Sequence, residues 1–233
     1  MMLSLIKTII KNIFAYGKVE VYEKLVSFAI LKQKFKQLND IKSFKNRELM
    51  WDDCLQENSL LAKKICFIEF GVYQGYSIKY FANKNTHKDS IFIGLDTFTG
   101  LPEQWNDAAK NTFNAEGSTP LINDQRVTFI KGIFQDTIKE LEEKILKFSD
   151  HYLIIHYDAD LYSSTVFALT QMDRLKKNYI AIFDEFISHE IRALYNYMQS
   201  HYASVDFISK TKLSFFDSRP MQLVCKINPR KIN

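Results

Sequence analysis

Short apolar runs alternate with amphipathic segments from residue 65 onward, and this alternation restricts the folds open to the chain. The runs at 152–158 and 178–184 are apolar almost throughout, not at every second residue. Continuous apolar strands joined by helices are typical of a parallel sheet covered on both faces. The pattern therefore predicts an α/β fold, with strands at 65–70, 90–96, 126–131, 152–158, 178–184, 203–209 and 221–227 and helices at 76–84, 136–148, 164–176 and 188–201.

The last two predicted strands have no helix between them. Residues 217–220 (Asp-Ser-Arg-Pro) supply a loop there, which favours an antiparallel hairpin at the end of the chain. The resulting sheet has seven strands, six of them parallel and the last one reversed.

The first 60 residues form a separate part of the prediction. They read as a helical extension, with an apolar face along residues 1–16 and further apolar positions at Val21, Leu25, Phe28 and Leu31. We expect this extension to pack on the core or on a second subunit, and a weak contact with a membrane surface is the alternative. We therefore predict two parts of the chain. Residues 1–60 form an extension for packing or oligomerisation, and residues 61–233 form the main domain.

Charge and composition exclude several classes of protein. Residues 1–50 hold ten Lys and Arg against four Asp and Glu, so the rest of the chain is slightly acidic and does not resemble a nucleic-acid-binding groove. No apolar run reaches the length of a transmembrane helix, and the early lysines argue against a signal peptide. The scattered Cys54, Cys66 and Cys225 suggest a reducing compartment, and we expect a cytoplasmic protein.

The turn after the first predicted strand has the composition of a ligand-binding loop. Glu69 ends the strand, and Gly71 and Gly75 lead into the next helix. Glycines at such a turn bring backbone N–H groups close to a ligand, while the acid favours a cation or a hydroxyl over a phosphate. The spacing differs from the dinucleotide pattern of three glycines. An ordinary tight turn between strand and helix would have a similar sequence.

Acidic residues end four of the predicted parallel strands: Glu69, Asp96, Asp158 and the pair Asp184-Glu185. Ligands of open parallel sheets bind beyond these strand ends, and an acid after the second strand commonly accepts hydrogen bonds from ribose. The other acids are oxygen ligands suited to Mg²⁺ or Mn²⁺. Two alternatives stay open, since Asp96 could be a solvated loop residue, and Asp158 or its neighbour could cap the following helix.

Five segments together resemble the macrocin O-methyltransferase family of class I S-adenosylmethionine-dependent methyltransferases. They occur in the family's order over about residues 45–227, and they are E-x-G-x-x-x-G-x-S at 69–77, D-T-F-x-G-L-P-E at 96–103, G-x-F-x-D-T at 132–137, D-A-D-L-Y-S-S-T at 158–165 and F-D-E-F at 183–186. The resemblance implies the Rossmann-like seven-stranded sheet of that class.

The resemblance also implies a site. The adenosylmethionine positions would be Glu69, Gly71, Gly75, Ser77, Asp96, Thr97, Phe98, Phe134 and Asp136. Asp158 would be both metal ligand and general base, with Asp184 and Glu185 as further ligands of Mg²⁺ or Mn²⁺. Glu185 departs from the paired aspartates of the antibiotic enzymes. His156 or His189 could replace Asp158 as the base.

The function predicted from the resemblance is metal-dependent methylation of a sugar hydroxyl, with the sugar nucleotide-linked or part of a surface polysaccharide or an antibiotic. Residues 101–125 would form a lid, with Trp105 and Phe113 as apolar contacts. We also expect a homo-oligomer. The alternatives are a catechol or small-phenol acceptor, a nicotinamide-dependent oxidoreductase and a non-catalytic binding module.

Overall fold

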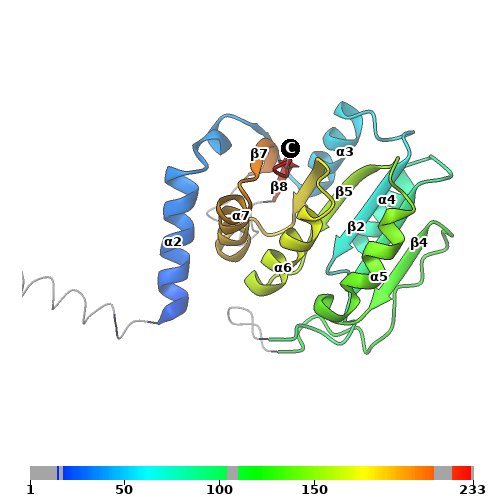
Figure 1. Ribbon diagram of the computed structural model, residues 1–233, viewed down its shortest axis with the longest axis horizontal. Coiled ribbons are helices and arrows are strands. Elements are labelled where there is room, and N and C mark those ends of the chain that lie inside the picture. The colour runs from blue at the N-terminus through cyan, green and yellow to red at the C-terminus, as the bar shows by residue number, and fades with distance from the viewer. Residues whose placement is uncertain (1–14, 16–17, 104–109, 213–221, 232–233) are drawn as a thin grey trace, which may run out of the picture.

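An eight-stranded sheet runs through the protein and carries helices on both faces (Figure 1). The computed structural model describes residues 15, 18–103, 110–212 and 222–231. The strands are β1 (Lys42–Phe44), β2 (Ile65–Phe70), β3 (Ile91–Asp96), β4 (Val127–Lys131), β5 (Tyr152–Tyr157), β6 (Tyr179–Phe183), β7 (Ser204–Thr211) and β8 (Leu223–Asn228). The helices are α2 (Val19–Gln33), the short 3₁₀ helix η1 (Lys36–Asn39), α3 (Arg47–Glu57), α4 (Tyr76–Lys84), α5 (Phe134–Leu146), α6 (Tyr162–Asp173) and α7 (Ser188–His201).

The strand order is β1-β7-β8-β6-β5-β2-β3-β4, and all neighbours are parallel except those of β8. β8 pairs antiparallel with both β6 and β7. The seven predicted strands and four predicted helices are confirmed, with ends that shift by a few residues. The residues 217–220 predicted to form the hairpin loop lie outside the described part of the chain.

The eighth strand, β1, comes from the segment predicted to be helical. It pairs parallel with β7 at the edge of the sheet, where Lys42 lies opposite Ser209. A three-residue strand is too short to show an alternation of apolar and polar residues, which explains why sequence patterns missed it.

The two faces of β2 bury different helices, which explains its continuous apolar sequence. Ile65 and Phe67 belong to the core cluster that contains α3 and α4. Cys66, Ile68 and Phe70 point to the opposite cluster, with α5, α6 and α7. Because side chains alternate across a strand and both faces of the sheet are covered, every position of β2 is buried, and Glu69 is its one polar residue.

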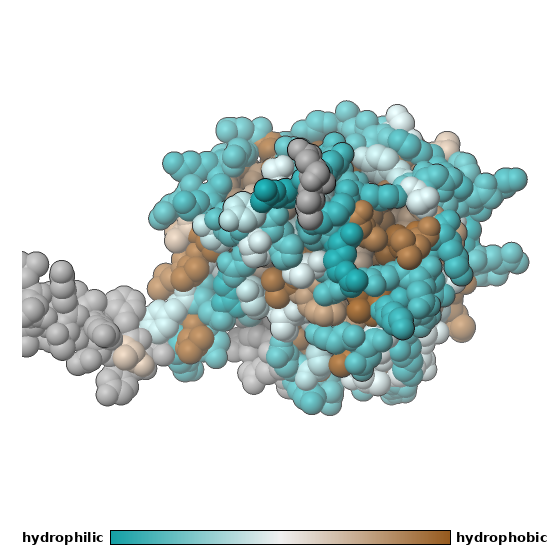
Figure 2. Space-filling view, viewed as in Figure 1, coloured by the Kyte–Doolittle hydropathy of each residue, from teal (hydrophilic) through white to brown (hydrophobic). Residues whose placement is uncertain are grey.

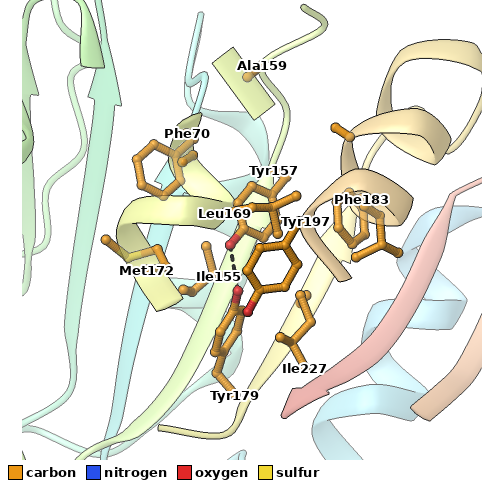
Figure 3. Packing of buried hydrophobic residues seen from close by; sticks show 14 of the residues in the cluster. Phe70, Ile155, Tyr157, Ala159, Leu169, Met172, Tyr179, Phe183, Tyr197 and Ile227 are labelled. Carbon is orange, nitrogen blue, oxygen red and sulfur yellow. Dashed lines mark hydrogen bonds between the residues drawn. The ribbon is translucent and has the colours of Figure 1, made fainter. Parts of the chain in front are cut away.

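The core cluster that includes α5, α6 and α7 buries hydroxyl groups as well as apolar side chains (Figure 3). The hydroxyls of Tyr157 and Tyr179 lie 2.9 Å apart, and the Tyr197 hydroxyl donates to Asp173 at 2.9 Å. Met172 and Leu169 of α6 pack beside them. Each buried hydroxyl therefore keeps a hydrogen-bond partner, as burial of polar groups requires.

Helix α2 lies against α7 at one side of the molecule (Figure 1). The Ser27 hydroxyl donates to the carbonyl of Ser188 at 2.7 Å, and Glu23 pairs with Arg192. Most of the apolar positions noted in this segment face outward, and Ser27 and Ile30 are the buried positions of this helix. Brown atoms over α2 in Figure 2 mark this exposed apolar surface, to which Val19, Val21, Leu25, Val26 and Phe28 contribute.

None of the described helices combines the length and the apolar content needed to cross a membrane. The predicted apolar face of residues 1–16 lies outside the described part of the chain. The boundary at residue 60 between extension and main domain stays a prediction.

Candidate active site

A cavity of about 300 Å³ opens at the carboxyl ends of the parallel strands. This is the edge where open α/β sheets bind their ligands. The cavity is lined by Arg47, Gly71, Val72, Tyr73, Gln74, Tyr76, Ser77, Asp96, Thr97, Gly100, Leu101, Pro102, Phe113, Ile133, Phe134, Gln135, Asp158, Ala159, Asp160, Ser164, Asp184 and Glu185.

Gly71 allows two neighbouring strand ends to meet at the floor of this cavity. Its φ is +91°, and a Cβ atom added there would lie 1.8 Å from the carbonyl oxygen of Asp158. A side chain would therefore collide with the backbone that carries Asp158. Gly75, with φ +74°, is the N-cap of α4, and a Cβ there would meet Pro120 at 3.0 Å. The two predicted glycines thus have a steric reason for being glycine.

Glu69 lies beneath the cavity and has no exposure to solvent. Its Oε1 atom lies 2.7 Å from Nδ1 of His156, and the Ser77 hydroxyl donates to the same oxygen. Burial by itself lowers the pKa of His156, but the carboxylates of Asp184 and Glu69 raise it to about 10. His156 is therefore an imidazolium at neutral pH, and it balances the charge of Glu69.

Asp184 accepts hydrogen bonds from two side chains that come from distant parts of the chain. Nη1 of Arg47 lies 3.2 and 3.3 Å from its two oxygens, and Nε2 of Gln222 donates to Oδ1 at 2.6 Å. Nε2 of His156 lies 3.7 Å from Oδ1. Although burial opposes it, His156 and Arg47 keep the pKa of Asp184 below its usual value.

Three further carboxyl groups at this edge have no such cation. Burial, followed by the charge of Asp184, raises the pKa of Asp158 well above its usual value. Burial and the neighbouring carboxylates raise the pKa of Asp160 to about 7 and that of Glu185 to about 8. In the absence of a balancing cation these carboxyl groups are therefore partly protonated near neutral pH, and a bound cation would favour their ionised forms.

The alternative that an acid caps the helix after β5 is not what the structure shows. Helix α6 has Leu161 at its N-cap, without a capping hydrogen bond from a side chain. Asp158 and Asp160 line the cavity instead. The helix start therefore does not explain why acids occur at these two positions.

Asp96 joins the two loops that flank the cavity. Its Oδ2 atom accepts from the backbone N–H groups of Val72 and Tyr73 at 2.7 and 2.8 Å, and Oδ1 accepts from that of Phe98 at 2.8 Å. The Thr97 hydroxyl also lies 3.4 Å from Oδ1, so these donors use most of the acceptor capacity of the carboxylate, and a ribose hydroxyl would compete with the Thr97 contact. Asp96 thus holds the loops of the site together and is also a candidate to bind a ribose.

Part of the predicted lid segment contributes to the cavity. Leu101, Pro102 and Phe113 line it, and the Phe113 ring meets that of Tyr73 edge-on at 5.6 Å. Trp105 lies outside the described residues. His189 is half-buried on α7 and does not line the cavity, and burial followed by the charge of Arg192 lowers its pKa.

The structure places most of the predicted site residues around one cavity. The lining includes Gly71, Ser77, Asp96, Thr97, Phe134, Asp158, Asp184 and Glu185. Four predicted positions are not part of the lining: Glu69 lies below it, Gly75 contacts Pro120, Phe98 is buried in the core and Asp136 is exposed on α5. The roles assigned to all these residues stay predictions.

Sequence reasoning missed the contribution of the N-terminal extension. Arg47 reaches the cavity from the first turn of α3, and Gln222 reaches Asp184 from the start of β8. Arg47 is 137 residues away from Asp184 in the sequence and is part of no recognisable motif. The signal available was indirect, since Asn46 is a favoured N-cap and places a helix start at Arg47.

Two groups of residues could hold a divalent cation. Ligand atoms of Glu69, His156 and Asp158 lie within 4.8 Å of one another. Oε2 of Glu69 and Nε2 of His156 are buried without a hydrogen-bond partner among the described residues, so both remain available as ligand atoms, although a cation on Nε2 would require His156 to be neutral. The predicted group of Asp158, Asp184 and Glu185 lines the open cavity and consists of hard oxygen donors, which fit Mg²⁺ or Mn²⁺.

Comparison with known proteins supports the family resemblance. Residues 119–209 match the family model described as macrocin O-methyltransferase (TylF). The match covers less than half of the chain, but it spans β4 to β7 and includes Asp158, Asp184 and Glu185. No match is found among individual curated proteins.

Solved structures confirm the fold. The structure of the O-methyltransferase NovP superposes with a TM-score of 0.53 at 18% sequence identity, covering 78% of each chain. An O-methyltransferase from Bacillus cereus, solved in complex with SAH, gives a TM-score of 0.50 at 14% identity and covers 96% of this chain and 97% of its own. The predicted class I methyltransferase fold is thus confirmed.

Proposed function

We propose that this S-adenosylmethionine-dependent O-methyltransferase, of the macrocin O-methyltransferase type, methylates a hydroxyl group of a sugar and uses a divalent metal ion to do so. The single observation that supports the proposal most is the meeting of Asp158, Asp184 and Glu185 with the Gly71 loop around one cavity. A cofactor loop and a set of hard oxygen ligands at the same strand ends suit an enzyme that both binds adenosylmethionine and activates a hydroxyl.

The bound cofactor supplies an electrophilic methyl group on a sulfonium. The residues of the chain have to position an acceptor hydroxyl in line with that group and remove its proton. Asp158 lines the cavity, and its backbone carbonyl lies against Gly71, so its carboxylate is placed to accept a proton from a hydroxyl bound next to the cofactor turn. We assign it the roles of general base and metal ligand. Asp184 shares its oxygens with Arg47 and Gln222, so its part in metal binding would be shared with these donors.

The cofactor positions follow from the lining of the cavity. Gly71 and Ser77 would border the methionine portion, Asp96 and Thr97 the ribose, and Phe134 the adenine. The cavity volume of about 300 Å³ is at the lower end of the range for ligand sites. Loop residues Leu101 and Phe113 would close over the bound molecule.

The decisive experiment separates chemistry from cofactor binding. We expect Asp158→Asn to lower turnover at least about 100-fold, because the base is lost, while affinity for S-adenosylhomocysteine in calorimetry changes little. Asp89→Asn, an exposed acid outside the cavity, is the matched control and should leave turnover unchanged. Full activity of Asp158→Asn in EDTA would refute both the base and the metal role.

The acceptor is identified by a second assay. Nucleotide-linked sugars, polysaccharide fragments and antibiotic sugars are compared with catechols, since both classes can present two adjacent hydroxyls to a metal. Methylation of catechols alone would refute the sugar assignment. A thermal shift with NAD but none with S-adenosylhomocysteine would refute the methyltransferase assignment altogether.

Two further expectations belong to this proposal. The exposed apolar side of α2 supports a homo-oligomer, which sedimentation velocity would test. Cys54, Cys66 and Cys225 are free and buried, which suits the reducing cytoplasm that we propose as the location of the enzyme.

A further inference from the structure

Arg47 is the one basic side chain among the described residues that line the cavity. The same lining contains five carboxyl groups, those of Asp96, Asp158, Asp160, Asp184 and Glu185. An anionic group that entered this cavity would be repelled by those carboxyl groups that are ionised. It would be stabilised only beside Arg47.

The Arg47 guanidinium is held in place from several sides. It lies 5.2 Å from the ring centre of Trp51 and 4.9 Å from that of Tyr76. Its Nη1 atom binds Asp184, and its Nε atom lies 3.5 Å from a carboxylate oxygen of Glu48. Within the described part of the chain, Nη2 has no hydrogen-bond partner. A planar, fixed guanidinium with a free edge is a preorganised site for a carboxylate.

We propose that Arg47 binds the α-carboxylate of the methionine portion of S-adenosylmethionine. The inference rests on the proposed function and adds a binding residue from the N-terminal segment to it. Tyr76, on which Arg47 stacks, is the first residue of α4 and directly follows the Gly71–Gly75 turn. The guanidinium therefore stands beside the turn where the methionine portion is expected.

The carboxylate of the cofactor fits this position better than an anionic acceptor. Asp160 and Glu185 line the same cavity, and their carboxyl groups, when ionised, would oppose a second anion there. Arg47 links Asp184 to the Gly71–Gly75 turn, because one nitrogen binds Asp184, the guanidinium stacks on Tyr76 and the free edge remains for a ligand. An arginine shared between an enzyme carboxylate and the cofactor would also fix the distance between the metal ligands and the methyl group.

The test compares two ligands that differ by the carboxylate alone. Calorimetry measures the affinity of S-adenosylhomocysteine and of its decarboxylated analogue for the wild-type chain and for Arg47→Met. We expect the wild type to prefer the carboxylate-bearing ligand at least about tenfold, the range of a charge-assisted hydrogen bond. Arg47→Met should lose this preference and bind the analogue as the wild type does. Arg47→Lys should retain part of it.

The controls separate this inference from the proposed function. Lys84→Met, which removes a cation of α4 that pairs with Asp52 outside the cavity, should keep the full preference. Equal weakening of both ligands by Arg47→Met would show a purely structural role and overturn the inference alone. The inference alone would also be overturned if Arg47→Met kept the wild-type preference for the carboxylate-bearing ligand and instead showed a raised KM for the acceptor. Failure of the wild type to bind either ligand would instead overturn the proposed function, and the inference with it.

Discussion

Nδ1 of His156 lies 2.7 Å from Oε1 of Glu69, in a place that solvent does not reach. The pair joins β5 to β2, and Oδ1 of Asp184 on the next strand end lies 3.7 Å from the other ring nitrogen. A buried imidazolium between two carboxylates lets acids gather at one edge of the sheet. The charges of these two acids are thus balanced by a protein cation, whereas the other acids of the site remain available to ligands.

Removal of the charge on His156 should destabilise the fold. Breaking a buried ion pair by removing one partner costs about 3–5 kcal/mol, because the other charge is left without compensation. We expect His156→Gln to lower the free energy of unfolding by about this amount in urea titrations at pH 6. His87 is only partly buried and has no carboxylate partner among the described side chains, so His87→Gln is the control.

The stability gap between the wild type and His156→Gln should depend on pH. The pKa of His156 is raised from 6.5 to about 10, so its stabilising contribution is fully present below pH 6.5 and is lost as the pH rises towards 10. Unfolding free energies of both proteins, measured from pH 6 to 10, should therefore converge. Parallel curves over this range would show that His156 is not charged in the folded protein.

Gly71→Ala should be far more harmful than alanine at another left-handed glycine. The added Cβ would lie 1.8 Å from the carbonyl oxygen of Asp158, and both partners are backbone of adjacent strands. We expect a loss of more than about 2 kcal/mol in the free energy of unfolding. At Gly117, with φ +73°, the nearest atom is the flexible end of Lys131 at 3.0 Å, so Gly117→Ala should cost only about 1 kcal/mol. Equal losses would refute the steric argument.

Local sequence patterns were sufficient for seven of the eight strands and for much of the cavity. Continuous apolar runs predicted β5 and β6 because both faces of these strands are buried. Acids at strand ends predicted the shared edge, since parallel strands bring their carboxyl ends together. The end of β6 thus places Asp184 and Glu185 beside Asp158 as expected.

Contacts between distant segments could not be predicted in this way. Arg47 meets Asp184 only because β1 and α3 fold back onto the edge of the sheet, and no local pattern encodes that return. Most apolar side chains of helix α2 face outward, while Ser27 donates to a backbone carbonyl of α7 and Glu23 pairs with Arg192. Tertiary packing decides which face of such a helix is covered.

The contact between Phe113 and Tyr73 should contribute to ligand binding. Both side chains line the cavity, and their edge-on contact links the loop to the Gly71 turn. We expect Phe113→Ala to weaken S-adenosylhomocysteine binding in calorimetry by about 0.5–1.5 kcal/mol, the worth of an aromatic pair. Leu121→Ala changes a fully exposed apolar residue of the same loop and should have no effect. Equal effects of the two substitutions would exclude a specific role for Phe113.

Uptake of Mg²⁺ should release protons near neutral pH. The pKa of Asp160 is about 7 and that of Glu185 about 8 without a metal, mainly because both are buried, so a part of each is protonated at pH 7. A cation binds the ionised forms, and its apparent affinity should therefore rise with pH from about 6 to beyond 8. Calorimetry in two buffers with different ionisation enthalpies measures the released protons directly. Asp160→Asn should remove the part of this release that is centred near pH 7, whereas Asp89→Asn should leave it unchanged. An affinity that stays constant from pH 6 to 9, with no proton release, would place the metal away from these acids.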